Sequence, residues 1–174
     1  MRRPSLLSAW LVVVPLVAGL PTTQEALALA FPGASIQRQE HFLSESQAQK
    51  ARTLAGVELP GLWWVAYEAR RDGRLVGVAF FDTHRVRTLN ETAMVAVNAD
   101  GTLRRVEVVA FREPQEYLPK DAWIRQLDGK RLDEGLSLKR SIRPLSGATL
   151  TAHVLVDASR RGLALHQVLY GAAK

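Results

Sequence analysis

The chain has 174 residues, of which 47% are hydrophobic and 23% are charged, and its formal net charge at pH 7 is +6. This length suits a single domain, and the hydrophobic fraction is well above that of intrinsically disordered chains. The sequence contains no cysteine, which excludes disulfides, c-type haem attachment and iron–sulfur clusters held by thiolates.

Residues 1–30 have the features of a signal peptide. Two arginines near the start precede an apolar run over residues 6–20, and the small-x-small sequence Ala-Leu-Ala at 28–30 provides a cleavage site. The apolar run is shorter than the roughly 20 residues that span a bilayer. We therefore predict that the signal peptide is cleaved and that residues 31–174 form one domain in the periplasm or another extracytoplasmic compartment. A retained N-terminal membrane anchor is the alternative.

Loss of the signal peptide removes two arginines and one glutamate and leaves a net charge of +5. Such an excess is typical of proteins that bind nucleic acid, anionic membrane surfaces or acidic proteins, and also of soluble surfaces with no dedicated partner. Export argues against nucleic acid as a partner.

The first half of the exported part predicts one helix and an antiparallel sheet. Ser44 and Gln47 fit a capping box, which predicts a helix from Ser44 to about Leu54 that ends at Gly56. Alternating hydrophobic residues then predict strands that Asp-Gly turns join in two hairpins. The four strand segments are 62–69 and 75–83, then 92–98 and 103–111.

The strands carry two conspicuous polar or aromatic groups. Trp63 and Trp64 are adjacent and therefore point to opposite faces of a strand, and we expect both to pack in the core. His84 and the arginines at 85 and 87 are expected on a solvated strand face, with contact to an acidic redox partner as the alternative. The four histidines show no ligand spacing, so no metal site is predicted.

The segment after the last predicted strand is less regular. A loop over 112–119 contains two prolines that prevent the strand from continuing. A short helix over 120–127 follows, and 132–142 is ambiguous, with a further strand possible around 136–142.

The last element is an amphipathic helix. Its apolar stripe consists of Leu155, Ala158, Gly162, Leu165 and Leu169. Asp157 and Arg161 are expected to form an ion pair on the other side of the helix. The sequence thus predicts an α+β fold, in which helices pack on an antiparallel sheet of two hairpins and the final helix follows an SGAT sequence.

The sequence PLSGATLTA, residues 144–152, lies at the start of this helix. Unpaired backbone N–H groups and the helix dipole favour a phosphate there. Gly147 and Ala148 allow close approach of a ligand to the backbone, and Ser146, Thr149 and Thr151 supply hydroxyl groups. A phosphate would be bound non-covalently or carried as an ester; ordinary helix capping by Ser or Thr is the alternative.

SGATLTA resembles the flavin-attachment motif S/T-G-A-T-x-x-S/T of the FMN-binding domain family, which includes the periplasmic G and C subunits of the Rnf and Na⁺-pumping NADH:quinone oxidoreductase complexes. Three further segments are similar to that family: DGTLRRVEVV at 100–109, FREPQEYLP at 111–119 and WIRQLDGK at 123–130.

The resemblance implies a covalent cofactor. FMN would be joined through its phosphate to Thr149 by an FAD:protein FMN transferase. The residues implied around the attachment point are Ser146, Gly147, Ala148, Leu150 and Thr151. The loop similarity implies that Glu113 and Tyr117 line the flavin ring. Arg143 stands where the family often has Asp, and we expect it to pair with the phosphate.

The function that the resemblance implies is electron transfer without conversion of a substrate. The protein would be an exported electron-transfer flavoprotein that exchanges electrons with a redox partner protein or a membrane electron-transfer complex. The alternatives are a module that binds FMN or another phosphorylated ligand non-covalently without redox relay, and a basic interaction protein that binds an anionic surface.

Overall fold

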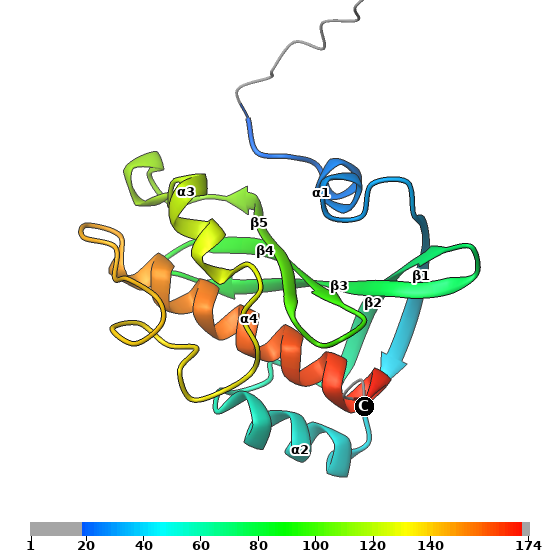
Figure 1. Cartoon of the computed structure of the whole chain (residues 1–174). Helices are drawn as coiled ribbons and strands as arrows, with labels where there is room; N and C mark the ends of the chain where they lie inside the picture. The colour runs from blue at the N-terminus through cyan, green and yellow to red at the C-terminus, as the bar shows by residue number, and fades with distance from the viewer. Residues whose placement is uncertain (1–18, 172–174) are drawn as a thin grey trace, which may run out of the picture.

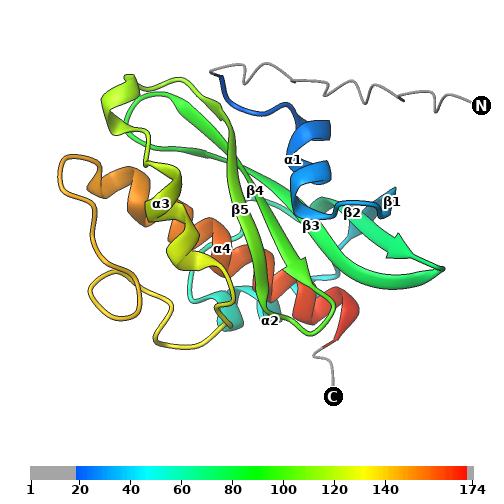
Figure 2. The same ribbon diagram turned by 45° about the horizontal axis from the view of Figure 1, so that its top comes forward.

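The structure, a computed structural model, describes residues 19–171 and contains one antiparallel sheet with helices on both faces (Figures 1 and 2). The strands lie side by side in chain order: β1 (Ser35–Phe42), β2 (Trp63–Arg71), β3 (Arg74–Arg85), β4 (Asn90–Asn98) and β5 (Leu103–Phe111). The helices are α1 (Thr23–Ala30), α2 (Glu45–Ala55), α3 (Asp121–Ile124) and α4 (Thr149–Tyr170), with 3₁₀ turns η1 (Gln115–Tyr117) and η2 (Arg125–Leu127). The predicted α+β fold is confirmed.

Both predicted hairpins form, and their turns have the predicted chemistry. Asp72 and Gly73 adopt φ values of 51° and 76°, which is the left-handed conformation that an Asp-Gly turn supplies between two strands. In the second hairpin Gly101 has a φ of 79°, and a carboxylate oxygen of Asp100 accepts a hydrogen bond of 3.0 Å from the backbone N–H of Thr102. These local interactions fix the registers of β2–β3 and β4–β5.

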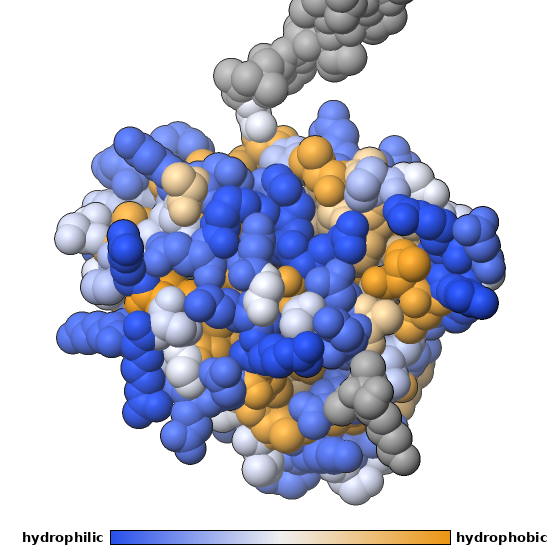
Figure 3. Space-filling view, in the orientation of Figure 1, coloured by the Kyte–Doolittle hydropathy of each residue, from blue (hydrophilic) through white to orange (hydrophobic). Residues whose placement is uncertain are grey.

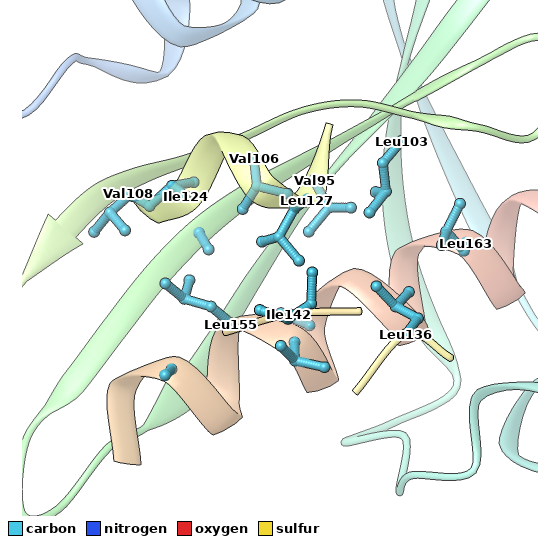
Figure 4. Close-up of a cluster of buried hydrophobic side chains, with 14 of the residues drawn as sticks. Val95, Leu103, Val106, Val108, Ile124, Leu127, Leu136, Ile142, Leu155 and Leu163 are labelled. Atoms are coloured by element: carbon cyan, nitrogen blue, oxygen red, sulfur yellow. The ribbon is translucent and has the colours of Figure 1, made fainter. Parts of the chain in front are cut away.

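The main core lies between the sheet and the helices on one of its faces. Side chains of β4, β5 and α4 meet those of α3, η2 and the loop at 132–142 (Figure 4). A second cluster joins α2 and the end of α4 to β2 and β3. On the other face, α1 covers part of the sheet through Ala26, Leu27 and Ala30, which pack with Met94.

The predicted apolar stripe of α4 faces this core. Leu155, Ala158, Gly162 and Leu165 are buried, and Leu169 is partly buried. At Gly162 the helix approaches β4 so closely that an added Cβ would lie 2.6 Å from a methyl carbon of Val95. The absence of a side chain at Gly162 therefore sets the distance between α4 and the sheet.

The expected ion pair on the outer side of α4 is wrong. Arg161 is buried, and its guanidinium binds the carboxylate of Asp82 in β3 with N···O distances of 2.6 and 3.1 Å, whereas no ion pair joins it to Asp157 within residues 19–171. The predicted apolar stripe of α4 has the correct spacing, but the buried face of the helix is wider than this stripe. Arg161 lies within that wider face.

The tandem tryptophans are separated by the sheet, as alternation requires. Trp64 is buried and donates a hydrogen bond of 3.0 Å from its indole N–H to the carbonyl of Gly61. Trp63 is 51% exposed on the opposite face. The expectation that both pack in the core is wrong for Trp63, because α1 packs over β4 and β5 and leaves this part of the face uncovered.

Two elements were not predicted, and the strand that the sequence left open around 136–142 does not form. The polar strand β1 pairs with β2 at the edge of the sheet, and α1 forms within the predicted signal peptide. Cleavage directly after 28–30 would remove α1 from the core; the cleavage position stays a prediction, and residues 1–18 lie outside the described part of the chain. Residues 132–142 form a loop, and Leu136 and Ile142 are the two side chains of this loop that are buried in the main core.

We predict that Gly162→Ala destabilises the protein by about 1–3 kcal/mol, because its Cβ would overlap with Val95. Helix propensity alone predicts the opposite sign, a gain of about 1 kcal/mol. Urea unfolding measures the change. The double variant with Val95→Ala provides the control: its loss should be smaller than the sum of the two single losses. A stabilised Gly162→Ala variant would contradict the close approach.

Candidate functional site

The SGAT sequence forms an exposed turn that leads into α4. Gly147 has a φ of 83°, and Ala148, the residue before the first helical residue, is buried. Ser146 and Thr149 are exposed. The hydroxyl of Thr149 donates a hydrogen bond of 3.2 Å to the carbonyl of Leu145, so its oxygen remains accessible. The turn thus presents a hydroxyl group at the first residue of the helix.

No side chain within the described residues caps the start of α4. The two shorter helices α1 and α2 have complete capping boxes, with Thr22 and Glu25 at α1 and Ser44 and Gln47 at α2. Ordinary capping therefore does not account for Ser or Thr in the SGAT sequence. The first N–H groups of a helix have no partner within the helix, so this end of α4 keeps donors for a ligand.

A small cleft of about 230 Å³ lies beside Thr149. Its walls come from three segments: residues 147–151 of the SGAT turn and α4, Val86 and Arg87 of the β3–β4 turn, and Tyr117 of η1. The guanidinium carbon of Arg87 lies 4.7 Å from the centre of the Tyr117 ring, a cation–π distance. The cleft combines a hydroxyl group, a cation and an aromatic ring.

Glu113 holds the β3–β4 turn in place. It is buried, and one carboxylate oxygen accepts hydrogen bonds from the backbone N–H groups of Arg87, Thr88 and Leu89 at 3.1, 2.8 and 2.9 Å. The bonds from Leu89 and Thr88 contribute most to lowering the pKa of Glu113 below its ordinary value. Glu113 does not line this cleft, but it positions the segment that carries Arg87.

A larger groove of about 1020 Å³ lies on the other side of the SGAT turn. Ser146 and Arg143 line it, together with Trp123 and Gln126. The backbone of Arg143 is fixed at both ends, because its carbonyl accepts a bond of 2.8 Å from the Trp123 indole and its N–H donates one of 3.0 Å to Gln126. Lys120, Lys130 and Arg140 add positive charge, against one carboxylate, Glu116.

The predicted site residues thus fall into two neighbouring sets. The small cleft is lined by Gly147, Thr149, Leu150, Thr151 and Tyr117. The large groove is lined by Arg143 and Ser146, and Ala148 lines both. Several lining residues escape prediction from sequence, among them Arg87 in the cleft and Trp123 in the groove. The H-R-V-R sequence between two strands is the available signal for Arg87, although its pattern favours a solvated strand face.

The expectation of a solvated face is wrong for His84, which belongs to a buried cluster of polar side chains from β3, β4 and α4. His84 Nδ1 lies 2.9 Å from Asp82, which also binds Arg161, and His84 Nε2 lies 3.9 Å from the fully buried Glu91. Within residues 19–171, His84 Nε2 and both oxygens of Glu91 have no hydrogen-bond partner. His84 precedes Val86, a residue of the cleft wall, by two positions in the sequence.

The environments of the two acids shift their pKa values in opposite directions. Burial raises the pKa of Asp82, but the hydrogen bonds from His84 and Arg161 outweigh it, so that the pKa lies below its ordinary value. Burial, and then the charge of Asp82, raise the pKa of Glu91 to about 8. Glu91 is therefore protonated and Asp82 ionised at neutral pH.

No protein-family model matches the chain, and no curated protein matches it significantly. Over residues 19–171, no group of acidic and histidine side chains is arranged to hold a metal ion. The described part of the chain also has no helix long and apolar enough to cross a membrane.

We predict that Glu91→Gln flattens the pH dependence of stability. Glu91 binds its proton more tightly in the folded state than in the unfolded state, so the wild-type unfolding free energy should fall as the pH rises from about 4.5 to about 8, by up to about 1.4 kcal/mol per pH unit. The variant lacks this titration. Its unfolding free energy, measured by urea unfolding, should therefore rise relative to that of the wild type as the pH increases from about 4.5 to about 8. Glu116→Gln, at an exposed position, is the control, and its curve of unfolding free energy against pH should be parallel to that of the wild type. A curve for Glu91→Gln that is also parallel to the wild-type curve would contradict the prediction.

Proposed function

We propose that this protein is an exported electron carrier with FMN linked through its phosphate to Thr149. The observation that carries the proposal is the uncapped start of α4, where the exposed hydroxyl of Thr149 lies beside a cleft containing Arg87 and Tyr117. The resemblance of the SGAT sequence and the neighbouring segments to the FMN-binding domain family supplies the identity of the cofactor.

The residues present fit the two ends of FMN. The free N–H groups at the start of α4, with the cations Arg87 and Arg143 on either side of the turn, suit a phosphodiester that keeps one negative charge. The cleft of about 230 Å³ is below the usual volume of a pocket for a cofactor, and the groove of about 1020 Å³ is at the upper end of that range. Tyr117 and Trp123 supply aromatic and apolar surface for the ring.

Attachment needs a donor and a transferase. The hydroxyl oxygen of Thr149 forms a new bond to the FMN phosphorus of FAD, the pyrophosphate bond breaks, AMP leaves and the hydroxyl proton is released. An FAD:protein FMN transferase supplies the catalytic groups for this step. A covalent bond retains the cofactor outside the cytoplasm, where free FMN would be lost by diffusion.

A bound flavin accepts two electrons and passes them on singly. This chain's residues then have three tasks: Thr149 anchors the cofactor, Arg87 and Tyr117 form one wall beside it, and Glu113 fixes that wall through the backbone of the β3–β4 turn. The electrons would go to a redox partner protein or a membrane electron-transfer complex.

One feature favours a second candidate function, the non-covalent binding of FMN or another phosphorylated ligand without redox relay. Arg143 stands where the family often has Asp, a residue that helps the transferase to recognise its target. Arg143 and the neighbouring cations of the large groove would still attract a phosphate. In that case denaturation would release the flavin, whereas an ester-linked flavin would remain with the chain.

We predict that co-expression with an FMN transferase raises the intact mass of the protein by the mass of FMN less one water. Thr149→Ala should abolish this gain completely, because it removes the acceptor oxygen. Thr53→Ala is the matched control, since it removes an exposed threonine hydroxyl of α2 that lies outside both the cleft and the groove, and it should leave the gain in place. An unmodified wild type, or modification that persists in Thr149→Ala, would overturn the proposal.

We also predict that Arg87→Ala lowers the two-electron potential of the bound flavin by about 20–60 mV, because loss of a nearby cation costs the reduced, more negative form about 1–3 kcal/mol. Spectroelectrochemical titration measures the potential. Arg85→Ala removes the same charge from an exposed position of the same hairpin that lies outside both the cleft and the groove. Equal shifts in the two variants would show that Arg87 does not lie beside the flavin.

A further inference from the structure

The outer edge of β1 is an open edge of the sheet. β1 pairs with β2 on one side, and within residues 19–171 no strand pairs with its other side (Figures 1 and 2). Every residue of β1 except His41 is exposed. An open edge presents unpaired N–H and C=O groups that another strand can join, and the edge at β5 differs because the segment at 129–130 hydrogen-bonds to Leu103.

Exposed apolar side chains lie beside this edge. Phe42 is 77% exposed and its cross-strand neighbour Trp63 is 51% exposed. At the other end of β1, Ile36 borders a groove of about 600 Å³ between α1 and the strand, which Leu27 and Tyr67 also line. Figure 3 shows hydrophobic surface on the side of the molecule where β1 and β2 lie in Figure 1.

The hydrogen bonds to β2 determine which backbone groups point outward. The N–H of Leu43 donates to the carbonyl of Leu62 at 2.8 Å, in continuation of the β1–β2 register. Backbone direction alternates along a strand, so the odd-numbered residues bond to β2 and the even-numbered ones point outward. The outward residues are Ile36, Arg38, Glu40 and Phe42, and their side chains share one face of the sheet.

These four residues are self-complementary in one antiparallel register. With a two-fold axis at Gln39, Arg38 lies opposite Glu40 of a second copy, and Ile36 lies opposite Phe42 of that copy. Each match occurs twice because of the symmetry. A shift by one residue pair in either direction would bring Arg38 opposite Arg38 or Glu40 opposite Glu40, and like charges opposite each other are destabilising.

We propose that a second copy of this chain pairs with the outer edge of β1 in this register, so that the two sheets form one continuous sheet. Phe42 of the second copy then packs on Ile36 beside the groove between α1 and β1. β1 and the start of α4 lie at opposite ends of the molecule (Figure 1). The dimer therefore leaves both SGAT turns exposed, and the inference does not depend on the proposed flavin.

The test uses charge reversal and sedimentation equilibrium over a wide range of protein concentration. The wild type should dimerise. Arg38→Glu and Glu40→Arg should each raise the dimer dissociation constant by about tenfold or more, because each creates two like-charge pairs across the two-fold axis. An equal mixture of the two variants should regain the dimer, since one chain then carries acidic side chains at both positions and the other carries basic side chains at both.

Three controls separate association from folding. Arg112→Glu reverses an exposed charge at the far end of the molecule and should leave the dimer intact. Far-ultraviolet circular dichroism checks that each variant is folded. The double variant Arg38→Glu/Glu40→Arg should also dimerise, which keeps the test valid if a single variant unfolds. A monomeric wild type, or a mixture that stays monomeric, would overturn the proposal and show that the two charges keep the edge free of partners.

Discussion

The close packing of α4 on β3 and β4 determines where the other parts of the molecule lie. Gly162 brings the helix against Val95, and Arg161 binds Asp82 in the buried interface. Together these contacts prevent the helix from sliding along the sheet or turning about its axis. Thr149 precedes Gly162 by about 20 Å along the helix, so its position beside the β3–β4 turn follows from packing at the middle of α4.

The same interface contains an unusual amount of buried charge. A buried ion pair such as Arg161–Asp82 adds little net stability, because desolvation of both groups offsets their attraction. Glu91 is buried without a hydrogen-bond partner among residues 19–171 and is protonated instead. A hydrophobic cluster would fill this space at lower cost. Natural proteins tend to break such local rules near functional sites, and Asp82 and Glu91 belong to the two strands of the hairpin whose turn forms a wall of the cleft.

The parts of the fold that were predicted from sequence depend on local signals. Asp-Gly turns and the Ser44–Gln47 capping box act within a few residues, so the hairpins and α2 were found. β1 was missed because it is an edge strand whose sequence, SIQRQEHF, contains few apolar residues. α1 was missed because it lies within a segment that resembles a signal peptide. In the candidate site, the SGAT sequence correctly located the turn before α4. Arg87 depends on the hydrogen bonds of Glu113 to a turn more than 20 residues away, which no local pattern encodes.

The start of α4 shows how packing permits a functional feature. α1 and α2 are short and each begins with a complete capping box, whereas no side chain of the described residues caps the 22-residue helix α4. A missing cap costs a helix about 1 kcal/mol, which is a large share of the stability of a short helix. α4 tolerates the loss because its length is buried against two other layers of the fold. Oxygen atoms of a bound phosphate would accept the hydrogen bonds that a cap normally accepts. The helix with the strongest tertiary anchoring is thus the one whose first turn is free for a ligand.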